Sequence, residues 1–136
     1  MRSGNIFLTL AGVALLALGM PAVGHAQQIF VIAHSGVQLD AAYVAEVFLG
    51  DKQFAGAVKI VPVDNGPLQE NFVGKALNMD SAKYNGKWAK KSFREGLNPP
   101  PVKSGDAEVG EYVKRTPGAV GYVASVPAGV TVIRKY

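Results

Sequence analysis

Few side chains in this sequence are equipped for catalysis. The 136 residues include no cysteine and two histidines, of which His34 alone lies outside the N-terminal apolar segment. A serine nucleophile needs a histidine base that a carboxylate orients, and Ser35 adjoins His34 in the chain without facing it. No His or Cys pair has metal-ligand spacing. We therefore predict a protein that is not an enzyme and has no catalytic residue, metal or cofactor.

Two turns have residue types that suit ligand binding. Ligands of open α/β sheets bind beyond the carboxyl ends of strands, where His34 and Ser35 follow one predicted strand and Asn65, Gly66 and Gln69 follow the next. The second turn also begins a helix, whose free N–H groups favour a negative group. These five residues are the candidate ligand-binding residues. The alternative is that they are ordinary turn and cap residues.

Four basic residues recur at helical spacing. Lys83, Lys87, Lys90 and Arg94 lie at i, i+4, i+7 and i+11, which places them along one face of a helix. Such a stripe is either a solvated face or a contact for an acidic partner or anionic lipid head groups. After residue 26 the chain has thirteen basic and ten acidic side chains. This small excess, without interleaved aromatic residues, excludes nucleic acid as the expected partner.

The N-terminus has the pattern of a secretory signal peptide. Arg2 precedes an apolar run over residues 6–18, and Gly24-His25-Ala26 supplies small residues for cleavage. We predict cleavage after Ala26, no remaining membrane anchor, and a periplasmic or secreted protein. Residues 27–136 suffice for one domain, which without cysteine has no disulfide bonds.

The remaining pattern predicts an α/β fold in the order β-α-β-α-α-α-β-β. Pro62 places the second strand at an edge or its end at a terminus. We expect Trp88 to anchor the third helix in the core, with a ligand platform as the alternative. We expect a single small mixed sheet flanked by about four helices. The predicted elements are strands at residues 29–33, 58–63, 119–124 and 130–133, and helices that begin at Asp40, at Asn65 or Gly66, at Asp80 and at Ser104.

The segment 116–123 joins the last predicted helix to a strand. Pro117 and Gly118 have the residue types of a type II turn. Beyond the turn, the small residues Ala119 and Gly121 share one face of the strand. We predict that this face allows a helix to approach the sheet closely, with a ligand as the alternative occupant.

Four features recur in an order that is typical of one protein family. They are Val47-Phe48-Leu49-Gly50, Val61-Pro62-Val63-Asp64, the spaced Trp88 and Phe93, and Pro117-Gly118-Ala119-Val120-Gly121-Tyr122-Val123. Together these motifs resemble the phosphate-binding subunits of ABC transporters, and more specifically short, single-lobe members of that periplasmic binding-protein superfamily. The resemblance implies one lobe of a type II periplasmic binding protein, with phosphate or another small anion as ligand.

The segment 64–69 departs from the family. It lacks the arginine and the Ser-Gly-Thr triplet that grip phosphate, and we expect Asp64 to repel an anion there. Two hypotheses follow. The first is an exported, non-enzymatic solute-binding module that holds a small anion or polar solute weakly, with homodimerisation as a way to rebuild a cleft. The second is an envelope protein-interaction module that kept the fold and lost the ligand.

Overall fold

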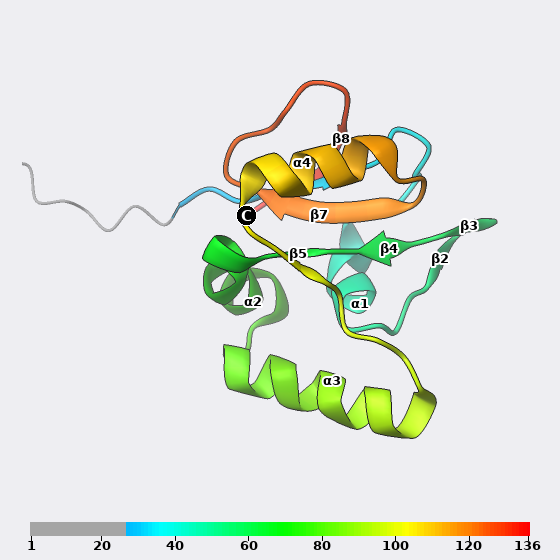
Figure 1. Ribbon diagram of the computed structural model, residues 1–136, viewed down its shortest axis with the longest axis vertical. Helices are drawn as coiled ribbons and strands as arrows, with labels where there is room; N and C mark the ends of the chain where they lie inside the picture. The colour runs from blue at the N-terminus through cyan, green and yellow to red at the C-terminus, as the bar shows by residue number, and fades with distance from the viewer. Residues whose placement is uncertain (1–26) are drawn as a thin grey trace, which may run out of the picture.

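The computed structural model describes residues 27–136, so the predicted signal peptide, residues 1–26, lies outside the described residues. The main elements follow the predicted order, and four α-helices flank a small mixed sheet (Figure 1). Short 3-10 turns at Ala41–Tyr43 and Gly66–Leu68 precede the first two helices. The elements are β1 (Phe30–Ala33), α1 (Val44–Phe48), β2 (Phe54–Ala55), β3 (Val58–Lys59), β4 (Val61–Pro62), β5 (Asp64–Asn65), α2 (Gln69–Leu77), α3 (Ser81–Glu95), β6 (Val102–Lys103), α4 (Asp106–Arg115), β7 (Ala119–Val123) and β8 (Thr131–Lys135).

The main sheet has the strand order β4-β7-β1-β8. Strand β1 is antiparallel to both β7 and β8, whereas β4 is parallel to β7. Pro62 lies in the edge strand β4, as predicted, because proline has no backbone N–H to donate to a neighbouring strand. The C-terminal strands therefore complete a sheet that β1 and β4 cannot form alone, because β7 lies between them.

The sheet has helices on both faces. In Figure 1, α4 lies above the strands, while α1, α2 and α3 lie below them. The buried apolar residues form two clusters that match these layers, and the smaller cluster, under α4, consists of Ile32, Val63, Val109, Val113, Ala119 and Val123. Phe48, Phe72 and Tyr122 form the aromatic centre of the larger cluster, and the rings of Phe72 and Tyr122 stack at 3.8 Å.

The turn before β7 has the predicted geometry. Gly118 has φ +82°, and the N–H of Ala119 donates to the carbonyl oxygen of Thr116 at 3.1 Å. The predicted small-residue face is also confirmed. A Cβ atom on Gly121 would lie 2.7 Å from Cγ1 of Val109, so glycine lets α4 pack directly on the strand backbone.

One strand and one helix boundary differ from the predictions. The predicted strand 58–63 is divided, because β3 turns away to form a hairpin with β2. The last helix begins at Asp106, with Gly105 in the cap position, and not at Ser104. Ser104 instead donates its N–H and its hydroxyl group to Glu108, and these hydrogen bonds hold the pKa of Glu108 below its usual value.

Helix α3 is the outermost helix, and it is the only helix in residues 27–136 that reaches fifteen residues. Asp80 caps it by accepting from the N–H of Lys83 at 2.7 Å, as the sequence indicates. Its buried residues are Tyr84 and Trp88, which confirms Trp88 as a core anchor. No helix between residues 27 and 136 combines the length and apolar character needed to cross a bilayer.

Candidate ligand cleft

The two predicted ligand-binding turns lie at opposite ends of the sheet. Ala33 pairs with Val120 at the start of β7, so His34 and Ser35 follow near that end. Strand β4 runs parallel to β7, and therefore Asn65 lies near the other end, beside Tyr122. The structure does not bring the two turns together. They cannot contact the same small ligand.

His34 and Ser35 form an ordinary turn. Nδ1 of His34 accepts from the N–H of Gly36 at 3.2 Å, and the N–H of His34 donates to the carbonyl oxygen of Ala119 at 2.9 Å. Ser35 is exposed. The hydrogen bonds of His34 and the exposure of Ser35 are typical of turn residues at the end of a strand.

The second turn is covered by the chain itself. The segment that follows the prolines forms β6, whose Val102 and Lys103 pair with Asp64 and Asn65. Asn65 is fully buried, and its amide donates to Asp106 at 2.9 Å and to the carbonyl oxygen of Tyr122 at 3.0 Å. Its Oδ1 atom has no partner among the described residues. A ligand that reached Asn65 would have to displace β6.

Gly66 and Gln69 lie at the rim of this covered turn. Gly66 is exposed, and a Cβ atom there would lie 3.1 Å from the carbonyl oxygen of Lys103. Gln69 is half-buried, and its side chain helps to oppose the rise in the pKa of Asp64. The helix start that the sequence suggested as an anion site is thus occupied by β6 and by neighbouring side chains.

The sequence suggested that Asp64 lies at the entrance of an anion site, where it would repel the ligand. The structure places it elsewhere. It is buried, and its two oxygen atoms accept from Tyr84 and Tyr122, each at 2.8 Å. Burial raises the pKa of the Asp64 carboxyl, and the hydrogen bonds from Tyr122, Tyr84 and Gln69 oppose that rise. Burial, followed by the charge of Asp64, also raises the pKa of both tyrosines. The carboxyl group thus joins three elements, β5, α3 and β7.

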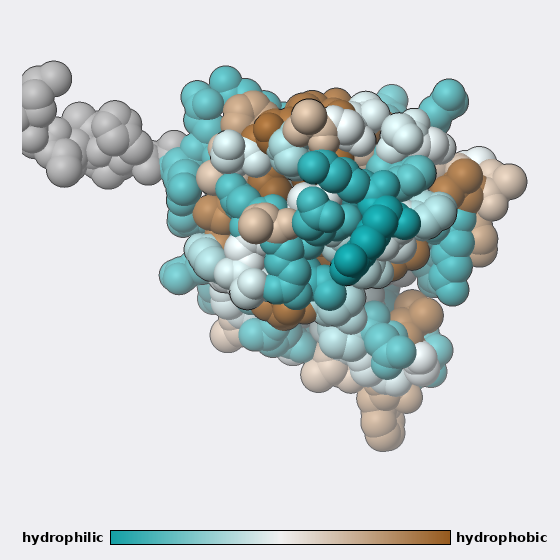
Figure 2. Space-filling view, turned by 45° about the horizontal axis from the view of Figure 1, so that its top comes forward, coloured by the Kyte–Doolittle hydropathy of each residue, from teal (hydrophilic) through white to brown (hydrophobic). Residues whose placement is uncertain are grey.

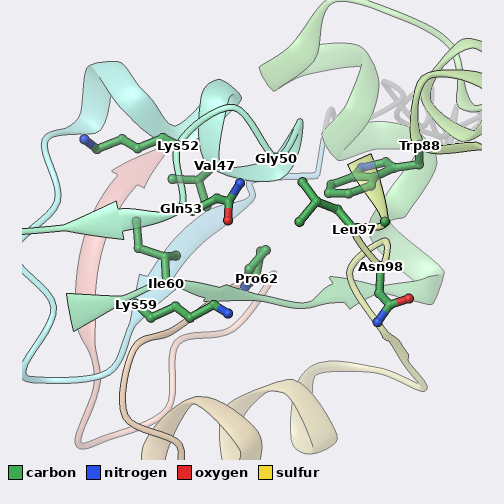
Figure 3. A pocket seen from close by; sticks show the side chains of 11 residues that line it. Val47, Gly50, Lys52, Gln53, Lys59, Ile60, Pro62, Trp88, Leu97 and Asn98 are labelled. Atoms are coloured by element: carbon green, nitrogen blue, oxygen red, sulfur yellow. The ribbon is translucent and has the colours of Figure 1, made fainter. Parts of the chain in front are cut away.

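A cleft of about 330 Å³ opens on another side of the molecule. It lies between the end of α1, strands β3 and β4, and the chain that leaves α3 (Figure 3). The apolar part of the wall consists of Val47, Ile60, Pro62, Trp88 and Leu97. Its volume falls in the range of small-molecule sites.

Polar side chains stand around this apolar wall. Figure 3 shows Gln53 and Lys59 extending toward the space between the strands and Trp88, with Asn98 on the opposite wall. Lys52 extends away, and its ammonium group lies 4.4 Å from the centre of the Tyr43 ring. The described residues that line the cleft include no Asp or Glu. The cleft therefore favours an anionic group attached to an apolar body.

The wall of the cleft is fixed by packing around Trp88. The indole N–H of Trp88 donates to the carbonyl oxygen of Phe48 at 3.0 Å. Gly50 has φ +75°, and a Cβ atom there would lie 2.6 Å from the indole ring. Lys91 adds a hydrogen bond to the carbonyl oxygen of Leu49 at 2.8 Å. The ring is therefore held in place before any ligand binds.

The basic stripe lies on the outer side of α3. Lys83, Lys87, Lys90 and Arg94 are all exposed, and none of them forms an ion pair with another residue in the range 27–136. Within the same range, no three His, Cys, Asp or Glu side chains lie close enough together to hold a metal ion.

The cleft combines two chain segments that are far apart in the sequence, 47–62 and 88–98, and no local pattern joins them. The available signals were Trp88 and the left-handed glycine at position 50, which mark a close contact. No protein-family model matches the chain, and no curated protein is detectably similar to it.

Proposed function

We propose that the protein is an exported, non-enzymatic solute-binding module, and that its ligand is a small anion with an apolar body. The observation that carries this proposal is the cleft beside Trp88, where Lys59 and Gln53 extend over an apolar wall that carries no acidic residue. The resemblance to the phosphate-binding subunits of ABC transporters is consistent with an anionic ligand.

The binding is weak. Gln53, Lys59 and Asn98 are exposed, so water competes with the ligand for each of them. An open cleft on one lobe cannot enclose and desolvate its ligand as a closed site does. The apolar wall is the part that a ligand removes from water, and it contributes about 25 cal/mol for each Å² buried.

The test uses Trp88, which is the single tryptophan of the sequence and lines the cleft. Its fluorescence and the melting temperature of residues 27–136 are followed during titration with phosphate, sulfate, benzoate and phenyl phosphate. We expect benzoate and phenyl phosphate to change both signals at lower concentrations than the inorganic ions. Neutral benzyl alcohol separates the contribution of charge from that of the ring.

Lys59→Gln is the decisive variant. Loss of a charge-assisted contact of about 1.4 kcal/mol weakens binding about tenfold. Lys114→Gln removes the same charge from α4, on the opposite face of the sheet, and should leave binding unchanged. If no probe alters the fluorescence or the melting temperature at millimolar concentration, the solute-binding proposal fails, and the interaction-module hypothesis is preferred.

Export is a separate part of the proposal. It is supported by the charged, apolar and small-residue regions of residues 1–26. Mass spectrometry of the protein secreted or released from the periplasm should find Gln27 at the N-terminus. An intact N-terminus would contradict cleavage after Ala26.

A further inference from the structure

Helix α3 concentrates the positive charge of the molecule. Its fifteen residues include five basic side chains and one acidic side chain, whereas the other described residues include eight basic and nine acidic ones. The net positive charge of residues 27–136 is therefore carried by this one helix. The rest of the domain is close to neutral.

The charge lies on the part of α3 that the fold leaves uncovered. Two of the fifteen residues, Tyr84 and Trp88, are buried, and the basic stripe runs along an exposed face. Like charges at i, i+3 and i, i+4 repel each other and destabilise a helix. Because no stripe residue has an acidic partner among residues 27–136, the fold does not offset this repulsion.

An aromatic side chain borders the stripe. Phe93 is 92 % exposed, more than any other large hydrophobic residue between positions 27 and 136. It lies on the outer half of the helix, about 60° around the axis from Lys90 and about 140° from Trp88. On the face in Figure 2, hydrophobic groups are scattered among hydrophilic ones. One group of atoms projects from the lower edge of this view, which is the side on which α3 lies in Figure 1.

A hollow adjoins the stripe. It has a volume of about 270 Å³ and lies between α3 and the chain that leaves α1. Of its two acidic residues, Asp51 is bound by Lys91, and Glu95 lies at the end of the helix. The hollow can admit a phosphate group between the cationic side chains that line it, Lys87, Lys90, Lys91 and Arg94.

We propose that α3 docks the domain on an anionic lipid surface, with the basic stripe on the head-group phosphates and Phe93 inserted at the boundary between head groups and acyl chains. Cationic side chains beside an exposed aromatic ring have the chemistry of an interfacial helix. An acidic protein surface would engage the stripe but would leave the fully exposed ring without an apolar environment. The lipid surface accounts for both features.

The test measures cosedimentation of residues 27–136 with vesicles of phosphatidylcholine, with and without about 30 % phosphatidylglycerol. We expect binding to the anionic vesicles alone, with release at about 0.5 M salt. Lys90→Gln/Arg94→Gln should lower the partition coefficient about 30-fold, since each cation near such a surface contributes about 1 kcal/mol. Phe93→Ala should lower it about tenfold.

The matched control is Lys114→Gln/Arg115→Gln, which removes one lysine and one arginine from the last turn of α4. It should bind as the wild-type domain does. Because the chain has no cysteine, Phe93→Cys can carry an environment-sensitive dye, whose emission should shift to the blue on anionic vesicles. Absence of binding to anionic vesicles, an equal loss in the control, or a dye that reports only water would overturn the proposal.

Discussion

The carboxyl group of Asp64 lies in the interior between two tyrosine hydroxyl groups that come from different elements. Tyr84 belongs to α3, and Tyr122 belongs to the central strand β7. Burial disfavours the charged carboxylate more than the hydrogen bonds favour it, and the pKa of Asp64 is therefore raised. Because the Asp64 carboxyl connects α3 to β7, the stability of this connection depends on pH.

We predict that Asp64→Asn changes the pH dependence of stability. Because the folded-state pKa is raised, the stabilising contribution is complete below the pKa of the unfolded chain, near 4, and is lost as the pH rises through the folded-state pKa. Asparagine does not titrate, yet it can bond to both tyrosines. The stability advantage of the wild type should decrease with rising pH, by about 1.4 kcal/mol for each unit of pKa displacement.

Urea unfolding of both proteins from pH 4 to pH 8 measures this difference. The comparison removes the contributions of other carboxyl groups, including Glu108, whose pKa is shifted in the opposite direction. Parallel pH profiles for the two proteins would contradict the prediction.

At the scale of elements, the turn between α4 and β7 combines a conformational and a steric requirement. Gly118 has φ +82°, and a Cβ atom there would lie 2.0 Å from the carbonyl oxygen of Lys59. Strand β4 pairs with β7 next to this turn, since the N–H of Val61 donates to the carbonyl oxygen of Gly118 at 2.8 Å. A side chain at this position would therefore disturb the turn and the edge strand together.

We predict that Gly118→Ala destabilises the protein by more than about 2 kcal/mol, from left-handed strain and the displaced strand. The matched control is Gly56→Ala in the β2–β3 hairpin, where φ is +60° but no atom lies within 4 Å of the added Cβ. The control should lose about 1 kcal/mol. Equal losses in thermal unfolding would show that the contact with Lys59 has no effect.

The sequence predicted those elements whose signals are local. The Pro117-Gly118 turn, the edge position of Pro62, the small face of Ala119 and Gly121 and the anchor Trp88 each follow from residue types a few positions apart, and the structure confirms them. These features determine the order of the elements and the packing of α4.

The features that the sequence did not predict depend on distant segments. Strand β6 pairs with β5 across about 38 residues, beyond a run of prolines that resembles an open connector, and this pairing buries Asn65. The hairpin at Gly56 was missed because each of its strands has only two residues. The cleft joins residues 47–62 to residues 88–98, so Trp88 and Gly50 could indicate a close contact but not the cleft itself.

At the scale of the whole molecule, α3 is attached to the rest of the domain by few contacts. Tyr84 bonds to Asp64, Trp88 bonds to the carbonyl oxygen of Phe48, and Lys91 bonds to the chain that leaves α1. The sheet strand β7, in contrast, is buried along its whole length. Segments with few buried contacts open at lower free energy than the core.

We predict that α3 opens as a unit before the sheet, and that Lys91→Met makes this opening easier. The substitution keeps an unbranched side chain that is one atom shorter, but it removes the hydrogen bond to Leu49 and the ion pair with Asp51. Loss of about 1.4 kcal/mol should speed amide hydrogen exchange in α3 about tenfold and leave β1 and β7 unchanged.

The control variant is Lys87→Met, one turn earlier on the exposed side of α3. It removes the same charge without these bonds, and its α3 should exchange at the wild-type rate. If α3 and β7 exchanged at one common rate in all three proteins, the domain would open only as a whole, and the separate mobility of α3 would be refuted.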